Sequence, residues 1–101
     1  MTDAVEFYWR PGCPFCMALR SRLRRSGIPF REVNIWEDPD AAARVRAVAG
    51  GNETVPTVFV GEQALVNPSI GQLKELVRQA VPDLLDQVEP GRRRRRYWPF
   101  R

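Results

Sequence analysis

The chain has 101 residues, which is enough for one domain around a single hydrophobic core. Hydrophobic residues make up 44% and charged residues 28%, a composition that excludes collagen-like and low-complexity chains and indicates a globular protein. No apolar run approaches the ~20 residues of a membrane-spanning helix. The segment Met1–Ala4 lacks the basic start of a signal peptide, so we expect a cytoplasmic protein.

The net charge of +4 is concentrated near the carboxyl terminus. Residues 1–88 carry ten Lys/Arg against eleven Asp/Glu, whereas residues 89–101 carry six arginines and one glutamate. We therefore predict a domain over residues 1–88 with no general affinity for polyanions. For residues 89–101, which are basic and aromatic, we expect a mobile tail. The alternatives are contact of this tail with nucleic acid or with an anionic membrane, and docking of Trp98 and Phe100 onto the domain.

The first half of the chain predicts two strand–helix units. Residues 5–9 are aromatic and apolar, which favours a strand, and a loop follows them. Over residues 13–26 the apolar residues recur at helical spacing, and Gly27 is suited to end that helix. Residues 30–36 alternate as a second strand. An Asp-Pro pair then starts a helix over residues 38–48, because these residues favour the cap and the first helical position.

The second half predicts a hairpin and a last helix. Residues 57–60 and 63–66 are apolar runs joined by Gly61-Glu62, which indicates a two-residue turn. Ser69, with glutamine three residues later, forms a capping box at a helix start. Residues 83–88 predict a further turn of helix. The order β-α-β-α-β-β-α requires a parallel first pair of strands and an antiparallel last pair, which predicts an α/β fold.

The two cysteines, Cys13 and Cys16, lie at the start of the first predicted helix. Residues at this spacing face the same way, and their Cα atoms then fall within the ~4.4–6.8 Å that a disulfide permits. A helix start favours negative charge, and Arg10 adds a positive charge nearby. Such surroundings lower a thiol pKa from ~8.5 into the range ~3.5–7.5. We therefore expect Cys13 to be the nucleophile and the less exposed Cys16 to be the resolving thiol.

Other uses of two cysteines are less consistent with the sequence. A structural zinc site needs four nitrogen or sulfur ligands, and the chain has no histidine and no third cysteine. An iron–sulfur cluster bridging two subunits and a pair of inert buried cysteines are the remaining alternatives. We therefore expect no bound metal or cofactor.

Two motifs resemble the dithiol glutaredoxin family. They are the segment from Tyr8 to Cys16, which ends in Cys-Pro-Phe-Cys, and the segment from Thr54 to Val60, which contains Thr-Val-Pro. The resemblance implies the thioredoxin fold, with a four-stranded mixed sheet and three helices. It also implies that Pro56 follows a cis peptide bond and that Val55 offers its backbone to the cysteine of a substrate.

A closer resemblance is to the actinobacterial mycoredoxins. It rests on the segments 50–58 and 67–69, which resemble stretches typical of that branch. Glutathione-using glutaredoxins usually have an aspartate that binds the γ-glutamyl end of glutathione, where this chain has Ile70. The resemblance therefore implies mycothiol rather than glutathione as the low-molecular-weight thiol. The residues between the cysteines, Pro14-Phe15, are closer to ordinary dithiol glutaredoxins.

Five further residues are candidates for substrate binding, each with a structural alternative. Arg10 is suited to a substrate carboxylate or to tuning Cys13, but is otherwise a solvated charge. Phe15 is expected at the rim of the site, or else in the core. Thr54 is suited to hydrogen-bond the backbone of a bound thiol, or else completes a turn. Asn67 is expected to stabilise the loop near the site, and Ser69 to cap a helix or contact a ligand.

The predicted activity is that of a thiol–disulfide oxidoreductase. Its expected partners are disulfide-containing proteins and a low-molecular-weight thiol, and we expect a monomer. One rival is a glutaredoxin-like electron donor, for example to ribonucleotide reductase, recharged by a flavoprotein disulfide reductase. A second rival is an iron–sulfur cluster carrier.

Overall fold

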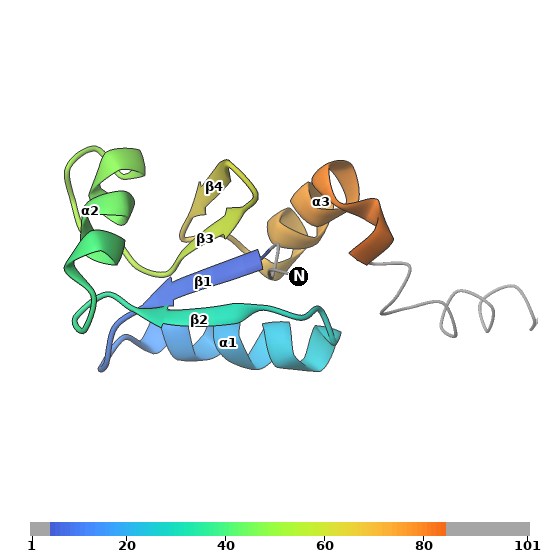
Figure 1. Cartoon of the computed structure of the whole chain (residues 1–101). Coiled ribbons are helices and arrows are strands. Elements are labelled where there is room, and N and C mark those ends of the chain that lie inside the picture. The colour runs from blue at the N-terminus through green and yellow to red at the C-terminus, as the bar shows by residue number, and fades with distance from the viewer. Residues whose placement is uncertain (1–4, 85–101) are drawn as a thin grey trace, which may run out of the picture.

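The computed structural model describes residues 5–84 and has the predicted order of strands and helices (Figure 1). The strands are β1 (Val5–Trp9), β2 (Arg31–Asn34), β3 (Thr57–Val60) and β4 (Gln63–Val66), and the helices are α1 (Pro14–Ser26), α2 (Pro39–Val48) and α3 (Ile70–Ala80). Residues 82–84 are also helical, as the start of the last predicted turn. The remainder of that turn and the predicted tail, residues 89–101, lie outside the described residues.

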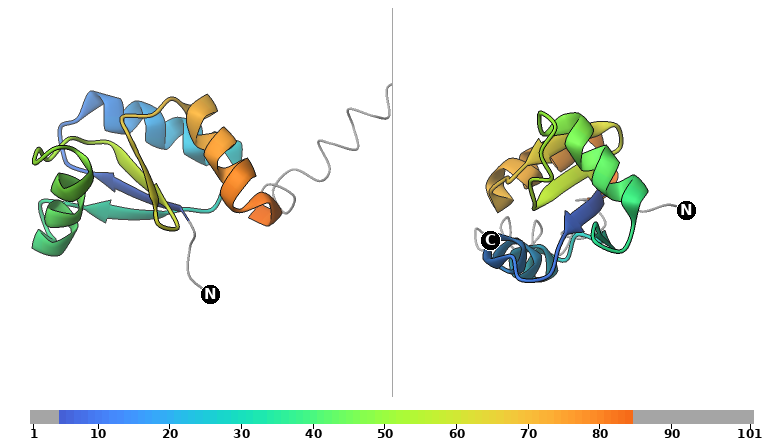
Figure 2. Two further views of the ribbon diagram at one scale, coloured as in Figure 1. Left: turned by 90° about the horizontal axis from the view of Figure 1, so that it is seen from above. Right: turned by 90° about the vertical axis from the view of Figure 1, so that its left-hand side faces the viewer.

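The four strands form one mixed sheet in the order β2-β1-β3-β4. Strands β1 and β2 are parallel, with Trp9 opposite Asn34, whereas β3 is antiparallel to both β1 and β4. The carboxyl ends of β1 and β2 therefore meet at one edge of the sheet. Helices α1 and α3 cover one face and α2 covers the other (Figure 2). This is the predicted thioredoxin fold.

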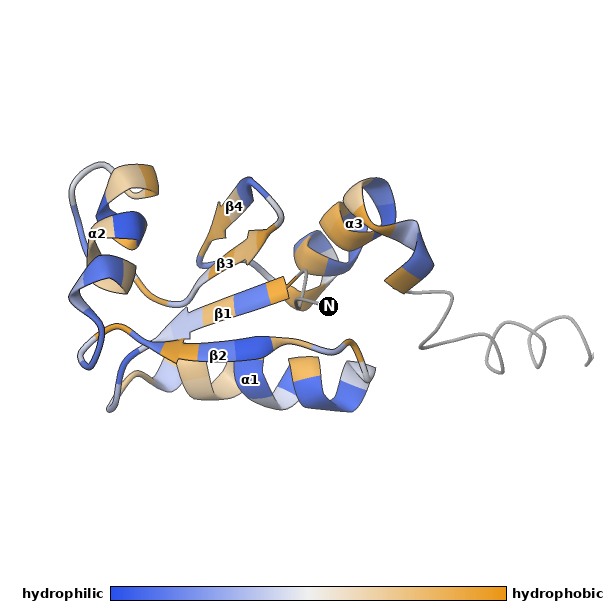
Figure 3. Ribbon diagram, viewed as in Figure 1, coloured by the Kyte–Doolittle hydropathy of each residue, from blue (hydrophilic) through white to orange (hydrophobic). Residues whose placement is uncertain are grey.

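Side chains of β1 point alternately to the two faces of the sheet, and each face has its own hydrophobic cluster. Val5 and Phe7 pack under α1 and α3, in a cluster that also contains both cysteines. Tyr8 belongs to a second cluster under α2. All four residues of β3 are buried, because helices cover both faces of this central strand, and Figure 3 shows its hydrophobic character. Cysteines 13 and 16 therefore stand at the end of a rigid, apolar layer.

The helix ends are formed by the residues that the sequence indicated. Helix α1 ends at Gly27, whose φ of 80° is one that glycine adopts without strain. Asp38 accepts hydrogen bonds from the backbone N–H groups of Asp40 and Ala41 and so caps α2. Ser69 and Gln72 form the complete capping box of α3. The start of α3, which borders the site described below, is thereby held in place.

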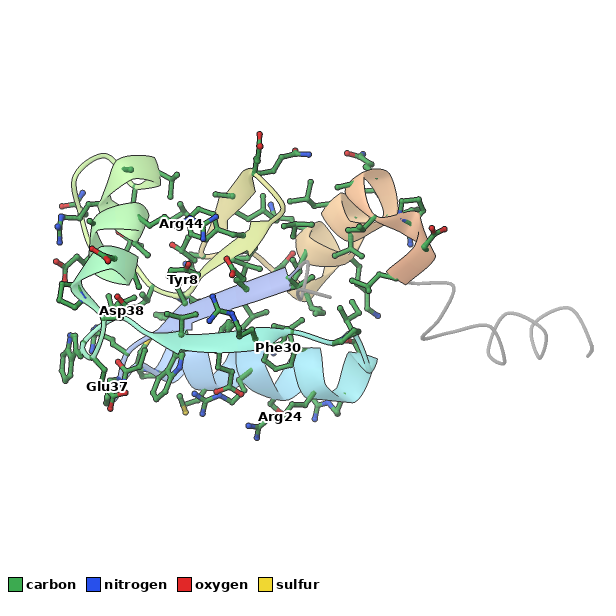
Figure 4. The ribbon with its side chains drawn as sticks, viewed as in Figure 1. Tyr8, Arg24, Phe30, Glu37, Asp38 and Arg44 are labelled. Atoms are coloured by element: carbon green, nitrogen blue, oxygen red, sulfur yellow. The ribbon has the colours of Figure 1, made fainter. Side chains whose placement is uncertain are left out.

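Helix α2 is tied to the sheet by one arginine. The Arg44 guanidinium donates to Tyr8 Oη at 2.7 Å and to Glu6 Oε1 at 2.8 Å, and Figure 4 shows Arg44 and Tyr8 pointing toward each other. The same guanidinium lies 4.0 Å from the centroid of the Phe59 ring.

Of the helices within residues 5–84, none is long and apolar enough to span a bilayer.

Candidate active site

Cys13 is the N-cap residue of α1. Its Sγ accepts a hydrogen bond from the backbone N–H of Cys16 at 3.2 Å, in the position that a serine or aspartate oxygen takes in an ordinary cap. The first N–H groups of a helix have no partner within the helix and carry partial positive charge. Cys13 Sγ is therefore held at the helix start, facing these N–H groups.

The Cys13 side chain is turned inward rather than projecting into solvent. It is 4% exposed, and its Sγ lies 3.8 Å from the carbonyl oxygen of Val55. This orientation follows from its two contacts, the helix start on one side and the loop before β3 on the other. A substrate sulfur must therefore enter between the beginning of α1 and Val55.

Cys16 lies one turn further along α1 and is fully buried, as predicted for the second cysteine. Burial raises the pKa of the Cys16 thiol to about 12, and the hydrogen bond and charge of Cys13 raise it as well. The Arg10 backbone and the Arg10 charge lower this pKa, and both effects are smaller than that of burial. Cys16 is consequently a neutral thiol over the physiological pH range while both cysteines are reduced.

The loop before β3 brings Val55 and Pro56 against the cysteines. The Val55–Pro56 peptide bond is cis, as the resemblance implies. The Pro56 carbonyl accepts a hydrogen bond from the Asn67 N–H at 2.7 Å, and Thr57 Oγ1 donates to the Thr54 carbonyl at 2.7 Å. Asn67 thus supports the loop, as expected. Thr54 completes a turn through its carbonyl, and its contact with a bound thiol stays a prediction.

Arg10 lies on the other side of the cysteines. Its guanidinium donates to the Pro11 carbonyl at 3.2 Å and lies 5.8 Å from the centroid of the Trp36 ring. Trp36 is 63% exposed, and it follows β2 at the edge where β1 also ends. The sequence does not single out Trp36 as a residue near the site. Its position was nevertheless indicated, because Trp36 follows β2, and β2 is parallel to β1, the strand that leads into Cys13.

A groove lies between α1 and the start of α3. It has a volume of about 380 Å³, and Phe15, Asn67, Ser69 and Ile70 are among the residues that line it. Phe15 is 67% exposed, so the expectation of a rim position rather than a core position is correct. Ser69 Oγ accepts from the Gln72 N–H at 3.1 Å, so its helix-capping role is confirmed, and its contact with a ligand stays a prediction.

The arrangement has the components of thiol–disulfide exchange. One sulfur is held at a helix start by a backbone N–H group, and a second lies one turn behind it as a neutral thiol. A backbone carbonyl and an apolar groove border the entrance. A thiolate in this position can attack a disulfide that enters beside Val55, and the second sulfur is placed to attack the resulting intermediate.

Comparison with known proteins shows the family to which the chain belongs. The family model described as glutaredoxin matches residues 5–65. A protein of Mycobacterium tuberculosis that bears a glutaredoxin name is 39% identical over 75 residues, which cover 73% of this chain and 89% of that protein. Glutaredoxin 3 of Escherichia coli is 35% identical over 60 residues, covering 58% of this chain and 70% of that protein.

Solved structures show the same fold. The glutaredoxin from Archaeoglobus fulgidus superposes with a TM-score of 0.66 at 27% identity, covering 76% of this chain and 88% of that chain. The glutaredoxin-like protein NrdH-redoxin from Escherichia coli superposes with a TM-score of 0.61 at 25% identity, covering 71% and 92%. With a matching family model, related sequences and the shared fold, the chain belongs to the glutaredoxin family of the thioredoxin fold.

Proposed function

We propose that this glutaredoxin reduces mixed disulfides between proteins and a low-molecular-weight thiol, with Cys13 as the nucleophile and mycothiol as the thiol. The observation that carries this proposal is the 3.2 Å hydrogen bond from the Cys16 backbone N–H to Cys13 Sγ at the start of α1. The reaction belongs in the cytoplasm, where thiols are kept reduced.

The chemistry is two successive exchanges of sulfur. The Cys13 thiolate attacks the small-thiol sulfur of the mixed disulfide, the S–S bond breaks, and the substrate protein leaves as a thiolate that takes up a proton. A second molecule of the small thiol, as its thiolate, then attacks the same sulfur and displaces Cys13, leaving the small thiol as its own disulfide. Each turnover thus consumes one mixed disulfide and one free small-thiol molecule, and it releases the reduced protein and the disulfide of the small thiol.

Cys16 provides the alternative second step. Its pKa is raised to about 12 by burial and, in addition, by the neighbouring Cys13. Once Cys13 is part of a mixed disulfide, the charge at position 13 is gone, so that second contribution is lost and the Cys16 pKa falls. Cys16 thereby becomes a stronger competitor for the Cys13 sulfur only after the first exchange. The resulting internal disulfide needs a small thiol or a flavoprotein reductase to open it.

The substrate is expected to align on the backbone of Val55. Thr57 is the first residue of β3 that pairs with β1 and with β4. Val55 precedes it, so its backbone is not paired with either neighbouring strand. Its carbonyl faces Cys13 Sγ at 3.8 Å. A substrate cysteine that pairs with this backbone brings its sulfur beside the Cys13 thiolate.

The choice of mycothiol rests on the start of α3 and on the related sequences. Ile70 is the first residue of α3 and lines the groove, at the position where glutathione-using relatives carry an aspartate. An isoleucine side chain cannot pair with the ammonium group of glutathione. The related sequences include a protein of Mycobacterium tuberculosis, which is consistent with the resemblance to an actinobacterial branch of the family.

A panel of reductants tests the proposal. We expect the protein to reduce a protein–mycothiol mixed disulfide with mycothiol at a kcat/KM about tenfold or more above that for the matching glutathione pair, because the lost ion pair alone corresponds to ~1–2 kcal/mol. Ile70→Asp should lower the ratio of kcat/KM with mycothiol to kcat/KM with glutathione. Equal rates with both thiols, or a faster reaction with glutathione, would contradict the mycothiol assignment.

A second candidate is an electron donor recharged by a flavoprotein. It is favoured by the similarity to NrdH-redoxin, a protein described as having a thioredoxin-like activity profile. The same panel separates the two candidates when a thioredoxin-reductase-type flavoprotein is included. Turnover with the flavoprotein and none with either small thiol would favour this second candidate.

A further inference from the structure

The cationic side chains divide into a large paired group and a small unpaired one. Six of the nine arginines within residues 5–84 make ion pairs with glutamates; they are Arg20, Arg24, Arg31, Arg44, Arg46 and Arg78. Arg10 stacks on Trp36. Arg22, Arg25 and Lys74 make no ion pair with any residue in this range.

These three unpaired cations come together at one place. They line a hollow of about 290 Å³ between α1 and α3, with Ser26 and Ile70 as the other lining residues. Arg22 and Arg25 are exposed, and Lys74 is half-buried. Three like charges around a concave surface focus a positive potential there and favour a bound anion.

The hollow adjoins the groove between α1 and the start of α3. Arg22 and Ile70 line both cavities. Toward the cysteines the lining is apolar, with Phe15, Ala18 and Pro68. Figure 2 shows α1 and α3 on the same face of the sheet. A ligand that starts at Cys13 therefore meets apolar side chains first and cations afterwards.

The distance along this path suits a polypeptide. Arg22 and Arg25 follow Cys13 by nine and twelve residues, which correspond to roughly 14–18 Å along a helix axis. An extended chain advances ~3.3 Å per residue, so the cations lie about four to six residues from a substrate cysteine.

We propose that the groove and hollow bind an extended acidic segment of the substrate protein, with apolar side chains next to the disulfide cysteine and Asp or Glu four to six residues away. This inference rests on the proposed function and adds a preference among its substrates. The acidic side chains pair with Arg22, Arg25 and Lys74, and the apolar ones contact Phe15 and Ala18.

The test compares two peptides in the same mixed disulfide, one with glutamates four to six residues from the cysteine and one with glutamines there. We expect the wild type to show a kcat/KM ratio of about tenfold in favour of the acidic peptide at low salt, since exposed ion pairs each contribute a few-fold. The ratio should approach one in high salt, where charges are screened.

The matched variants are the triple change Arg22→Gln, Arg25→Gln, Lys74→Gln and the control Arg24→Gln. The triple variant should lose the preference. Arg24→Gln should keep it, because Arg24 lies in the last turn of α1 beside Arg25 but pairs with Glu32 outside the hollow. Equal rates for both peptides in the wild type, or a preference that survives the triple change, would overturn the inference.

Peptide binding without chemistry separates this inference from the proposed function. The same two peptides, with serine in place of the cysteine, are titrated by fluorescence anisotropy. If the protein binds the acidic peptide preferentially but reduces no disulfide, the proposed function is refuted. The peptide preference, and with it the inference, is then still supported. Duplex DNA and anionic vesicles are titrated in the same way. If the wild type shows no peptide preference, and the triple variant binds DNA or vesicles more weakly than the wild type, the hollow binds those polyanions and the inference is overturned.

Discussion

Replacing Cys13 with serine is expected to lower kcat/KM for a mixed disulfide by about 10³-fold or more, to the rate of the uncatalysed exchange. A hydroxyl can still cap α1 in this position, so the fold is retained. It cannot form the S–S bond that the reaction passes through. The measurement is steady-state reduction of a protein–mycothiol mixed disulfide, with circular dichroism as the control for folding.

Cys16→Ser is the matched variant. It leaves the backbone N–H at residue 16 in place, and that group donates to Cys13 Sγ. We expect it to keep the reduction of mixed disulfides within about threefold, because the small thiol performs the second step, and to lose the reduction of disulfides within a protein. Full activity in Cys13→Ser would refute the assignment of the nucleophile. Loss of both activities in Cys16→Ser would mean that the internal disulfide is obligatory.

The largest effect on stability is expected for Phe7→Ala. Phe7 is fully buried in the central part of the sheet and makes an edge-to-face contact with Phe30, with ring centroids 6.0 Å apart. Its truncation leaves a cavity in the layer that also holds the cysteines, and the free energy of unfolding should fall by about 3–5 kcal/mol. Urea denaturation of the reduced protein measures the change.

Phe15→Ala is the control, because the same side chain is removed from a position that is 67% exposed. Its effect on the free energy of unfolding should stay within about 0.5 kcal/mol. It should raise KM for peptide substrates, since Phe15 lines the groove. Equal destabilisation by the two substitutions would contradict the placement of Phe7 in the core and of Phe15 at the surface.

The positions of the cysteines could be predicted because they depend on local structure. A strand, a Pro-Gly loop and a Cys-Pro helix start place Cys13 at the cap and Cys16 one turn behind it, whatever the remainder of the chain does. The same holds for Ser69, whose capping box is contained in four consecutive residues. The approach of Val55 to Cys13 was available from the family resemblance alone, since it joins residues 42 positions apart.

Features that depend on tertiary contacts were not predicted. The nearly complete burial of Cys13 results from its two contacts, one with α1 and one with the loop before β3. The stacking of Arg10 on Trp36 requires β1 and β2 to end side by side, which only their pairing determines. The hollow of unpaired cations requires α3 to lie along α1, and the spacing of arginines within a helix does not indicate which of them lack a glutamate partner.

The most direct test of the account is selective alkylation of the reduced protein with iodoacetamide, with each cysteine followed by peptide mass spectrometry as the pH is raised. Cys13 should react first, because its Sγ stands at the open end of α1 whereas Cys16 is fully buried. Cys16, whose pKa burial raises to about 12, should stay unmodified until strongly alkaline pH. Modification of both cysteines at similar rates, or of Cys16 before Cys13, would contradict the account.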